Sequence, residues 1–200
     1  MSVTSEIEST SRSAPRTAPT RERLRASGVA LFATRGLHSV TTHDIAHDAG
    51  LAAGTFYLHY KDKQALFTEI VLDALDALRT RVAEAVRDVP DPALAVERHA
   101  TALVDFAADN RDLIRVLFSG EHEAAALEHD VLETLAEAIA KGRSAGGRVP
   151  RGVDPRVLAQ AVVGMYARVV AWWAADPSRA TREDLVASLT RIQLHGTQPD

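Results

Sequence analysis

A chain of 200 residues is long enough for one medium domain or two small ones, each with its own core. The composition, 46% hydrophobic and 25% charged, is that of an ordinary soluble globular protein, and the lack of cysteine excludes disulfides and thiolate metal sites. The net charge of −4 conceals a basic N-terminal third, because residues 12–67 hold eight Lys/Arg against four Asp/Glu. A basic segment on an acidic body indicates a nucleic-acid-binding module.

The chain carries no pattern typical of export or of membrane insertion. The apolar stretch 157–175 is interrupted by Gln160 and Arg168, which predicts a buried helix rather than a membrane span. The N-terminus has arginines but no apolar segment of the kind found in signal peptides. We therefore expect a cytoplasmic protein without a membrane partner, beginning with a disordered tail over residues 1–19.

The rest of the chain predicts an all-α fold of about nine helices, because helical periodicity persists from Thr20 onward and strand-like alternation does not. Thr20 can cap the first helix, which ends at Gly36. Thr41 and Asp44 have the spacing of a capping pair for a short second helix. The helices are expected over 20–36, 42–49, 53–60, 62–86, 92–109, 111–119, 124–142, 154–175 and 181–195.

The first three helices have the pattern of a helix-turn-helix. Each is hard to stabilise alone, so their apolar side chains must converge on one small core. Ala46 allows a close helix crossing, and Gly50 supplies the left-handed turn that aims the next helix into the major groove. The residues expected in this core are Leu24, Leu31, Phe32, Val40, Ile45, Ala46, Ala49, Leu51 and Phe56.

One segment of this region resembles a known family. The residues from Val40 to Lys63 read VTTHDIAHDAGLAAGTFYLHYKDK, which resembles the DNA-binding signature of TetR-family repressors, and the resemblance extends over about residues 21–70. It implies a helix-turn-helix domain over 20–66 and a helical effector-binding and dimerisation domain over 67–196. It also implies a non-enzymatic regulator without a cofactor, released from an inverted-repeat DNA operator by a small-molecule effector.

The resemblance assigns roles to single positions. Thr42 and Lys63 correspond to residues that bind phosphates, and Tyr57 and His59 to residues that meet the backbone or the groove edge. Hydroxyl and ammonium groups suit phosphate contacts, and small residues allow close approach to the bases. The positions that read base edges correspond to His43, Ala53, Gly54 and Thr55.

Two residues depart from the family pattern. Ala52 stands where a serine commonly caps the recognition helix, so we expect that helix to fray without DNA. Gly28 stands where alanine is usual, which costs about 1 kcal/mol in helix propensity.

The resemblance further implies that the last two helices, 154–175 and 181–195, pair with their copies in a homodimer. Small and apolar side chains would make that contact, whereas an intramolecular core is the alternative. The expected interface residues are Ala161, Gly164, Ala167, Leu185, Leu189 and Ile192.

A cavity for a largely apolar effector is expected between the long fourth helix and those that follow. Apolar and aromatic side chains would form its walls, with a few polar partners, although ordinary packing is the alternative for each. The expected lining residues are His99, Leu103, Phe106, Arg115, Phe118, His122, Met165, Tyr166 and Trp172.

Other functions fit the residues less well. His43 and His47 have the spacing of two zinc ligands on one helical face, but no third ligand is evident, so we interpret them as exposed histidines without a metal. An all-α enzyme would need paired catalytic groups, and spacing reveals none. A nonspecific nucleoid-type binder would need a more basic surface. Glu121 and Glu123 are interpreted as surface charge.

Overall fold

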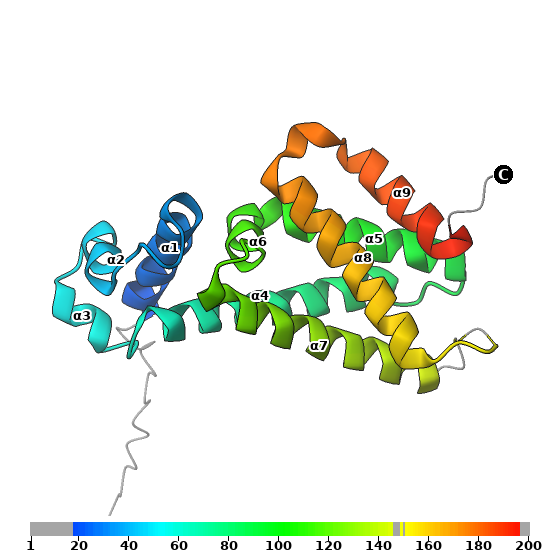
Figure 1. Cartoon of the computed structure of the whole chain (residues 1–200), viewed down its shortest axis with the longest axis horizontal. Coiled ribbons are helices and arrows are strands. Elements are labelled where there is room, and N and C mark those ends of the chain that lie inside the picture. Colours follow the sequence, from blue (N-terminus) through cyan, green and yellow to red (C-terminus); the bar gives the residue numbers. More distant parts are fainter. Residues whose placement is uncertain (1–17, 146–148, 150, 197–200) are drawn as a thin grey trace, which may run out of the picture.

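The computed structural model describes residues 18–145, 149 and 151–196. Within these residues the chain contains nine α-helices, one short 3-10 helix and no strand (Figure 1), which confirms the all-α prediction. The expected tail over 1–17 lies outside the described residues. Its last two positions, 18 and 19, belong instead to the first helix.

The N-terminal part consists of α1 (Ala18–Arg35), α2 (Thr42–Asp48) and α3 (Ala53–Tyr57), which lie together at one end of the molecule (Figure 1). The expected capping pair is confirmed: Asp44 N donates to Thr41 Oγ1 at 3.1 Å, and Thr41 N donates to the Asp44 carboxylate at 2.9 Å. These two bonds begin α2 directly after the turn that follows α1.

The recognition helix α3 is shorter than expected and ends at Tyr57 rather than at residue 60. The reason lies at the start of α4 (Lys63–Val86), where extended Asp62 caps the helix by accepting a hydrogen bond from Ala65 N at 2.7 Å. Because the backbone must leave the helical conformation before this cap, the residues after Tyr57 form a turn.

The remaining helices form the body of the molecule, with α4 and α7 running along one side and α8 crossing them (Figure 1). Asp91 and Asp154 cap α5 and α8, and each precedes a proline at the first helical position. These helices are α5 (Pro92–Asp109), α6 (Arg111–Leu117), α7 (His122–Ala145), α8 (Pro155–Ala175), the 3-10 helix η1 (Pro177–Arg179) and α9 (Arg182–His195).

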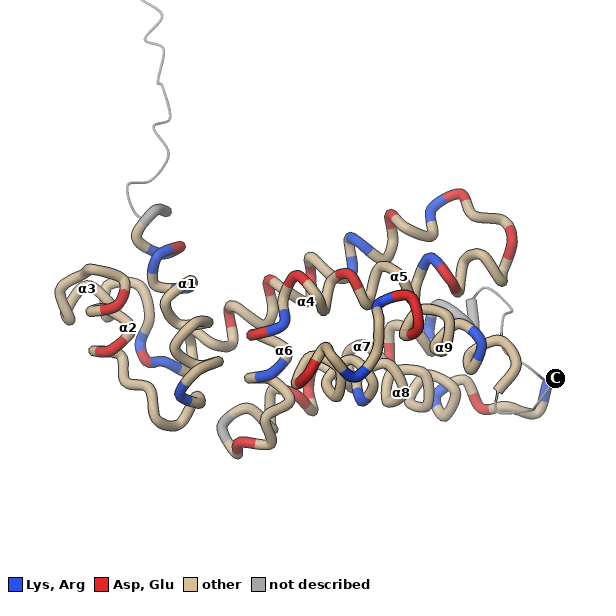
Figure 2. The backbone as a smooth tube through the Cα atoms, turned by 90° about the horizontal axis from the view of Figure 1, so that it is seen from above, with Lys and Arg blue, Asp and Glu red and all other residues tan. Residues whose placement is uncertain are grey.

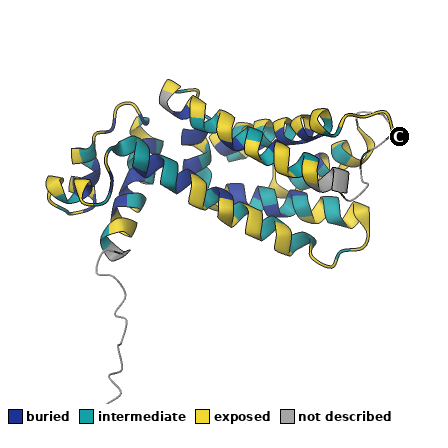
Figure 3. Ribbon diagram, turned by 90° about the horizontal axis from the view of Figure 1, so that it is seen from below, coloured by how far each residue is buried: buried dark blue, intermediate teal, exposed yellow. Residues whose placement is uncertain are grey.

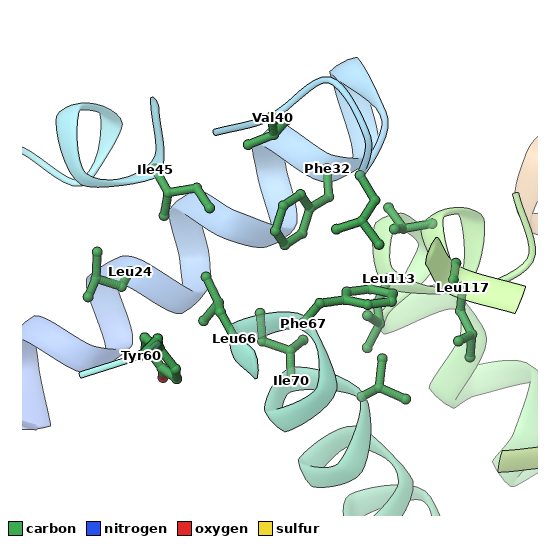
Figure 4. Packing of buried hydrophobic residues seen from close by; sticks show 14 of the residues in the cluster. Leu24, Phe32, Val40, Ile45, Tyr60, Leu66, Phe67, Ile70, Leu113 and Leu117 are labelled. Carbon is green, nitrogen blue, oxygen red and sulfur yellow. The ribbon is translucent and has the colours of Figure 1, made fainter. Parts of the chain in front are cut away.

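One hydrophobic cluster joins the two parts of the chain. Phe67 of α4 is 1% exposed and packs edge-to-face on Phe32 of α1, with ring centroids 5.8 Å apart. Leu113 and Leu117 of α6 belong to the same cluster, and Figure 4 shows the Phe67 ring between Phe32 and α6. The expected division between residues 66 and 67 therefore falls inside a shared core.

Gly28 allows α1 to approach α4 closely. A Cβ atom at this position would lie 2.9 Å from Leu66 Cδ2, closer than side chains normally pack. The departure from alanine is thus explained by packing between α1 and α4.

Helix α8 is long and apolar enough to cross a membrane by length and composition. Its inner face is buried against other helices of the body, with Val162, Tyr166 and Trp173 in a cluster that also contains residues of α5 and α9. Figure 3 shows buried residues on the inner sides of the body helices and exposed residues on their outer sides. This packing is typical of a core helix.

An ionic cluster ties α1 to α4 beside the shared core. The Arg21 guanidinium donates to Glu69 Oε1 at 3.0 Å, and Tyr60 Oη donates to the same oxygen at 2.8 Å. These hydrogen bonds, that from Arg21 first, lower the pKa of Glu69 to about 2. Burial, followed by the bond to Glu69, raises the pKa of Tyr60 to about 12.

The depressed pKa of Glu69 predicts a pH-dependent contribution to stability. Because the pKa in the folded state lies below the ordinary value of 4.5, the contribution is present above pH 4.5 and is lost as the pH falls towards 2. Glu69→Gln should therefore lower the free energy of unfolding at pH 6 more than at pH 3, measured by urea denaturation. Glu84→Gln, an exposed change on the same helix, should produce no such difference. An equal loss at both pH values would contradict the prediction.

Candidate functional site

The outer faces of α2 and α3 form a surface that protrudes from the end of the molecule; we call it the α2–α3 surface. Phe56, 0% exposed, anchors α3 to the core, whereas Tyr57 on the same helix is 61% exposed. The hydroxyls of Tyr57 and Thr42 are hydrogen-bonded at 2.8 Å and so join the two helices. Gly50 has a φ of 65°, the left-handed turn expected between them.

The other expected DNA-contacting residues lie on α2, on α3 or in the turn directly after α3. His43 is exposed and stacks on His47, with centroids 6.5 Å apart. Ala53 and Gly54 are exposed. The remaining two, Thr55 and His59, are half-buried. Figure 2 shows Lys, Arg, Asp and Glu residues spread along the molecule rather than gathered at α3.

Lys63, expected to contact a phosphate, makes hydrogen bonds within the protein. Its ammonium donates to the carbonyl oxygens of Leu37 and His38, at 2.7 and 2.9 Å, and so stabilises the turn between α1 and α2. The resemblance implied a phosphate contact for Lys63 but could not reveal these two acceptors. Lys61, two residues earlier, is exposed.

Sequence analysis overlooked Leu58. Its side chain is 81% exposed beside Tyr57, an unusual position for leucine. Phe56 and Tyr60, four residues apart and both buried, were the available indication, because a residue two positions after an inward one lies on the opposite side of a helical turn. Leu58 adds an apolar group of the kind that contacts thymine methyls.

The recognition helix lacks a side-chain cap, as the sequence predicted for Ala52. Ala52→Ser should supply an acceptor for the first amides of α3 and stabilise that helix by about 0.5–1 kcal/mol. Amide hydrogen exchange over residues 53–57 should slow severalfold. Ala53→Ser, one residue inside the helix, is the control and should leave exchange unchanged. Equal effects of the two serines would contradict the capping explanation.

A second site lies in the body, where helices α4 to α8 enclose a cavity of about 350 Å³. Its walls are almost entirely apolar, formed by aliphatic side chains with Phe106 and Phe118, and its polar lining side chains are Arg79, His99 and Tyr166. His99 stacks on Tyr166 with centroids 5.4 Å apart, and the Tyr166 hydroxyl is hydrogen-bonded to Gln193 at 2.7 Å. The cavity is therefore suited to an apolar molecule.

Five expected pocket residues line this cavity: His99, Leu103, Phe106, Phe118 and Tyr166. The other four lie elsewhere. They are Arg115, exposed and paired with Asp112; His122, exposed at the start of α7; Met165, packed in the α5–α8–α9 cluster; and Trp172, exposed beneath the Arg179 guanidinium.

The cavity was expected beside the fourth helix, but the side chains that α4 and α7 contribute to its walls were not among the expected residues. Side chains one or two helical turns apart on these helices face the same space, which was the available indication. The missed lining residues include Val71, Leu75, Leu78 and Val82 of α4 and Val131, Leu132, Leu135 and Ile139 of α7.

The expected dimer interface is partly wrong. Leu185 and Leu189 are 5% and 1% exposed and pack within the body against α5, so they are unavailable to a second copy. Ala167 faces the cavity. Ala161 and Gly164 are exposed on α8, as is Ile192, at 42%, on α9.

Among the residues that the structure describes, no group of three or more His, Cys, Asp and Glu side chains could hold a metal ion. The pair His43 and His47 accordingly has no third ligand there.

Comparisons with known proteins agree with this architecture. Residues 24–70 match the family model described as bacterial regulatory proteins, tetR family. The transcriptional regulator YdgC of Bacillus subtilis is 25% identical over 72% of this chain and 76% of its own length. The transcriptional repressor KstR2 of Mycolicibacterium smegmatis is 35% identical, but only over 36% of this chain and 35% of its own length.

Solved structures extend the likeness of fold to the body. The fatty acid degradation regulator FadR of Bacillus halodurans is 18% identical and covers 94% of this chain with all of its own, at a TM-score of 0.79. Thermus thermophilus FadR, a TetR-family repressor solved with lauroyl-CoA, is 22% identical, covers 90% of this chain with 96% of its own, and has a TM-score of 0.64. Residues 24–70 therefore match the DNA-binding part of the TetR family of bacterial regulatory proteins, and the whole chain has the fold of solved TetR-family regulators.

Proposed function

We propose that the protein is a homodimeric repressor that binds an inverted-repeat operator and releases it when an apolar effector enters the cavity. The observation that carries this proposal is the position of α4, whose first residues pack with the helix-turn-helix and whose later residues line the cavity. One rigid helix thus belongs to both sites. The repressor KstR2 and the lauroyl-CoA-binding FadR of Thermus thermophilus support the proposal.

The effector we propose is an acyl chain, carried as a thioester or free acid. Aliphatic walls favour a methylene chain, because each buried CH₂ contributes about 0.8 kcal/mol. At roughly 30 Å³ for a water-sized group, the cavity accommodates about a dozen carbons. The Tyr166 hydroxyl is already bonded to Gln193, so this polar group needs no partner from the chain.

An effector bound in the cavity would move α4 and thereby change the distance between the two recognition helices of the dimer. These must lie about 34–36 Å apart, one turn of DNA, to enter successive major grooves. An effector that favours the displaced state by about 1–3 kcal/mol suffices for a regulatory response.

We propose that the dimer forms through the outer faces of α8 and α9. Ala161 and Gly164 leave room for close helix approach, and Val157, Trp172 and Ile192 add exposed apolar area. The proposed interface does not include Leu185 and Leu189, because both are buried within the body.

The cavity is a poor catalytic site. Among the residues that the structure describes, its lining includes no serine, threonine or cysteine, and its tyrosine and histidine are stacked on each other. We therefore propose a binding protein without enzymatic activity.

Selection of random duplexes by the purified protein at about 150 mM salt tests the DNA-binding proposal, because nonspecific phosphate binding is weak there. An enriched inverted repeat is expected. Binding without enrichment would instead identify a nonspecific DNA binder.

Lauroyl-CoA added to the selected complex tests the effector, and release of the DNA is expected. Leu78→Trp, which fills the cavity, should retain operator binding but lose the response, whereas Leu72→Trp on the exposed side of α4 should retain both. Release that is unaffected by Leu78→Trp would show that lauroyl-CoA acts elsewhere.

A further inference from the structure

The turn between α1 and α2 is stabilised from two directions. Lys63, at the start of α4, donates to the carbonyls of Leu37 and His38. From the body of the molecule, Glu121 Oε2 accepts a hydrogen bond from His38 N at 3.0 Å. Two carbonyls and one amide of this short turn are therefore bonded to side chains far away in the sequence.

Gly36 gives the Glu121 carboxylate access to the turn. Its φ of 79° is a conformation that glycine adopts without strain, and a Cβ atom here would collide with Glu121 Oε1. Any other residue at position 36 would displace the carboxylate.

Glu121 also has a direct mechanical connection to the cavity. It immediately precedes α7, and Val131 and Leu135 of that helix line the cavity. Val131 additionally belongs to the core shared with the helix-turn-helix. Because a helix moves as a rigid unit, a displacement of α7 by a bound molecule would carry Glu121 with it.

On the other side, the turn leads directly into α2. Only two residues separate His38 from Thr41, whose capping box begins that helix. Thr42, at the first helical position, is hydrogen-bonded to Tyr57 of the recognition helix. The backbone from His38 to Thr42, with a hydrogen bond at each end, thus connects the Glu121 carboxylate to the α2–α3 surface.

We propose that Glu121 is a positioning residue that transmits the position of α7 to the helix-turn-helix through the turn at residues 36–38. The proposal rests on the effector function proposed above and specifies how occupancy of the cavity reaches the DNA-binding surface in addition to any motion of α4. A hydrogen bond from an amide to a carboxylate is stronger than one between neutral groups, which suits a contact between two moving parts.

Amide hydrogen exchange in the ligand-free, full-length protein tests the positioning role. Glu121→Ala should accelerate exchange of the His38 amide and its neighbours over 36–40 by about tenfold, because the amide loses a charged acceptor. Glu121→Gln keeps an acceptor oxygen and should restore most of the protection. Asp130→Ala, an exposed carboxylate on the same helix, is the control and should leave exchange in the turn unchanged. Exchange in Glu121→Ala within twofold of the unaltered protein would overturn the proposal.

Lauroyl-CoA then serves as the probe of transmission. In the unaltered protein it should slow exchange at residues 131–139 and alter exchange at 36–40. In Glu121→Ala the first change should persist and the second should disappear. Persistence of both changes would exclude transmission through Glu121. Absence of any change at 131–139 would contradict the acyl-chain effector instead, while the ligand-free comparison still decides the role of Glu121.

Discussion

Replacing Phe67 with alanine should lower the free energy of unfolding by about 3–5 kcal/mol. The ring is 1% exposed and lies where α1, α4 and α6 meet (Figure 4). Its removal takes away both its own burial and the edge-to-face contact with Phe32. The cavity that remains cannot close readily, because three helices would have to move together.

Urea denaturation of the full-length protein, followed by circular dichroism, measures this loss. Leu72→Ala is the control for helix propensity, because Leu72 lies on the same helix and is 48% exposed. It should lower the free energy of unfolding by less than about 1 kcal/mol. Losses of similar size in the two variants would show that the shared core contributes little.

Replacing Tyr57 should weaken operator binding strongly while leaving the fold intact. Tyr57→Ala removes a 61% exposed aromatic ring from the α2–α3 surface and should cost about 2 kcal/mol of binding, roughly a 30-fold loss of affinity. Tyr57→Phe keeps the ring and removes the hydroxyl bonded to Thr42, so about 1 kcal/mol is expected. Titration of the selected operator at constant salt measures both.

A double-mutant cycle resolves how the hydroxyl acts. If the Tyr57–Thr42 bond orients the two side chains as a unit, Thr42→Val combined with Tyr57→Phe should cost no more than the larger single change. Strictly additive losses would instead mean that each hydroxyl contacts DNA independently. A drop in thermal stability that accompanies the loss of affinity would attribute the effect to folding.

Local chemistry made the order of helices predictable. Capping pairs, glycine stops and proline starts act within a few residues, so α2 begins after Thr41 and α5 begins at Pro92, as expected. The recognition helix ended earlier than expected because the cap at Asp62, which belongs to the next helix, interrupts it. The exposed position of Tyr57 could be predicted because it depends only on which residues of a short helix face outward.

Positions that depend on packing between distant segments were harder to predict. Lys63 carries the charge expected near DNA, but its acceptors lie on a turn 25 residues away. The apolar periodicity of α9 is the same whether Leu185 and Leu189 face α5 or a second copy, and only the packed structure distinguishes the two. Glu121 has a role because the fold brings it to a turn 83 residues earlier.

The core shared by the helix-turn-helix and the body also limits how either part can be exchanged for that of another protein. The buried cluster contains Phe32 and Ile45 from the DNA-binding end together with Leu113 and Leu117 of α6. A hybrid made by joining residues 1–66 to the body of another regulator would leave half of that interface without its complement. A biosensor built by exchanging the DNA-binding domain between such proteins would therefore need the matching α6 residues as well.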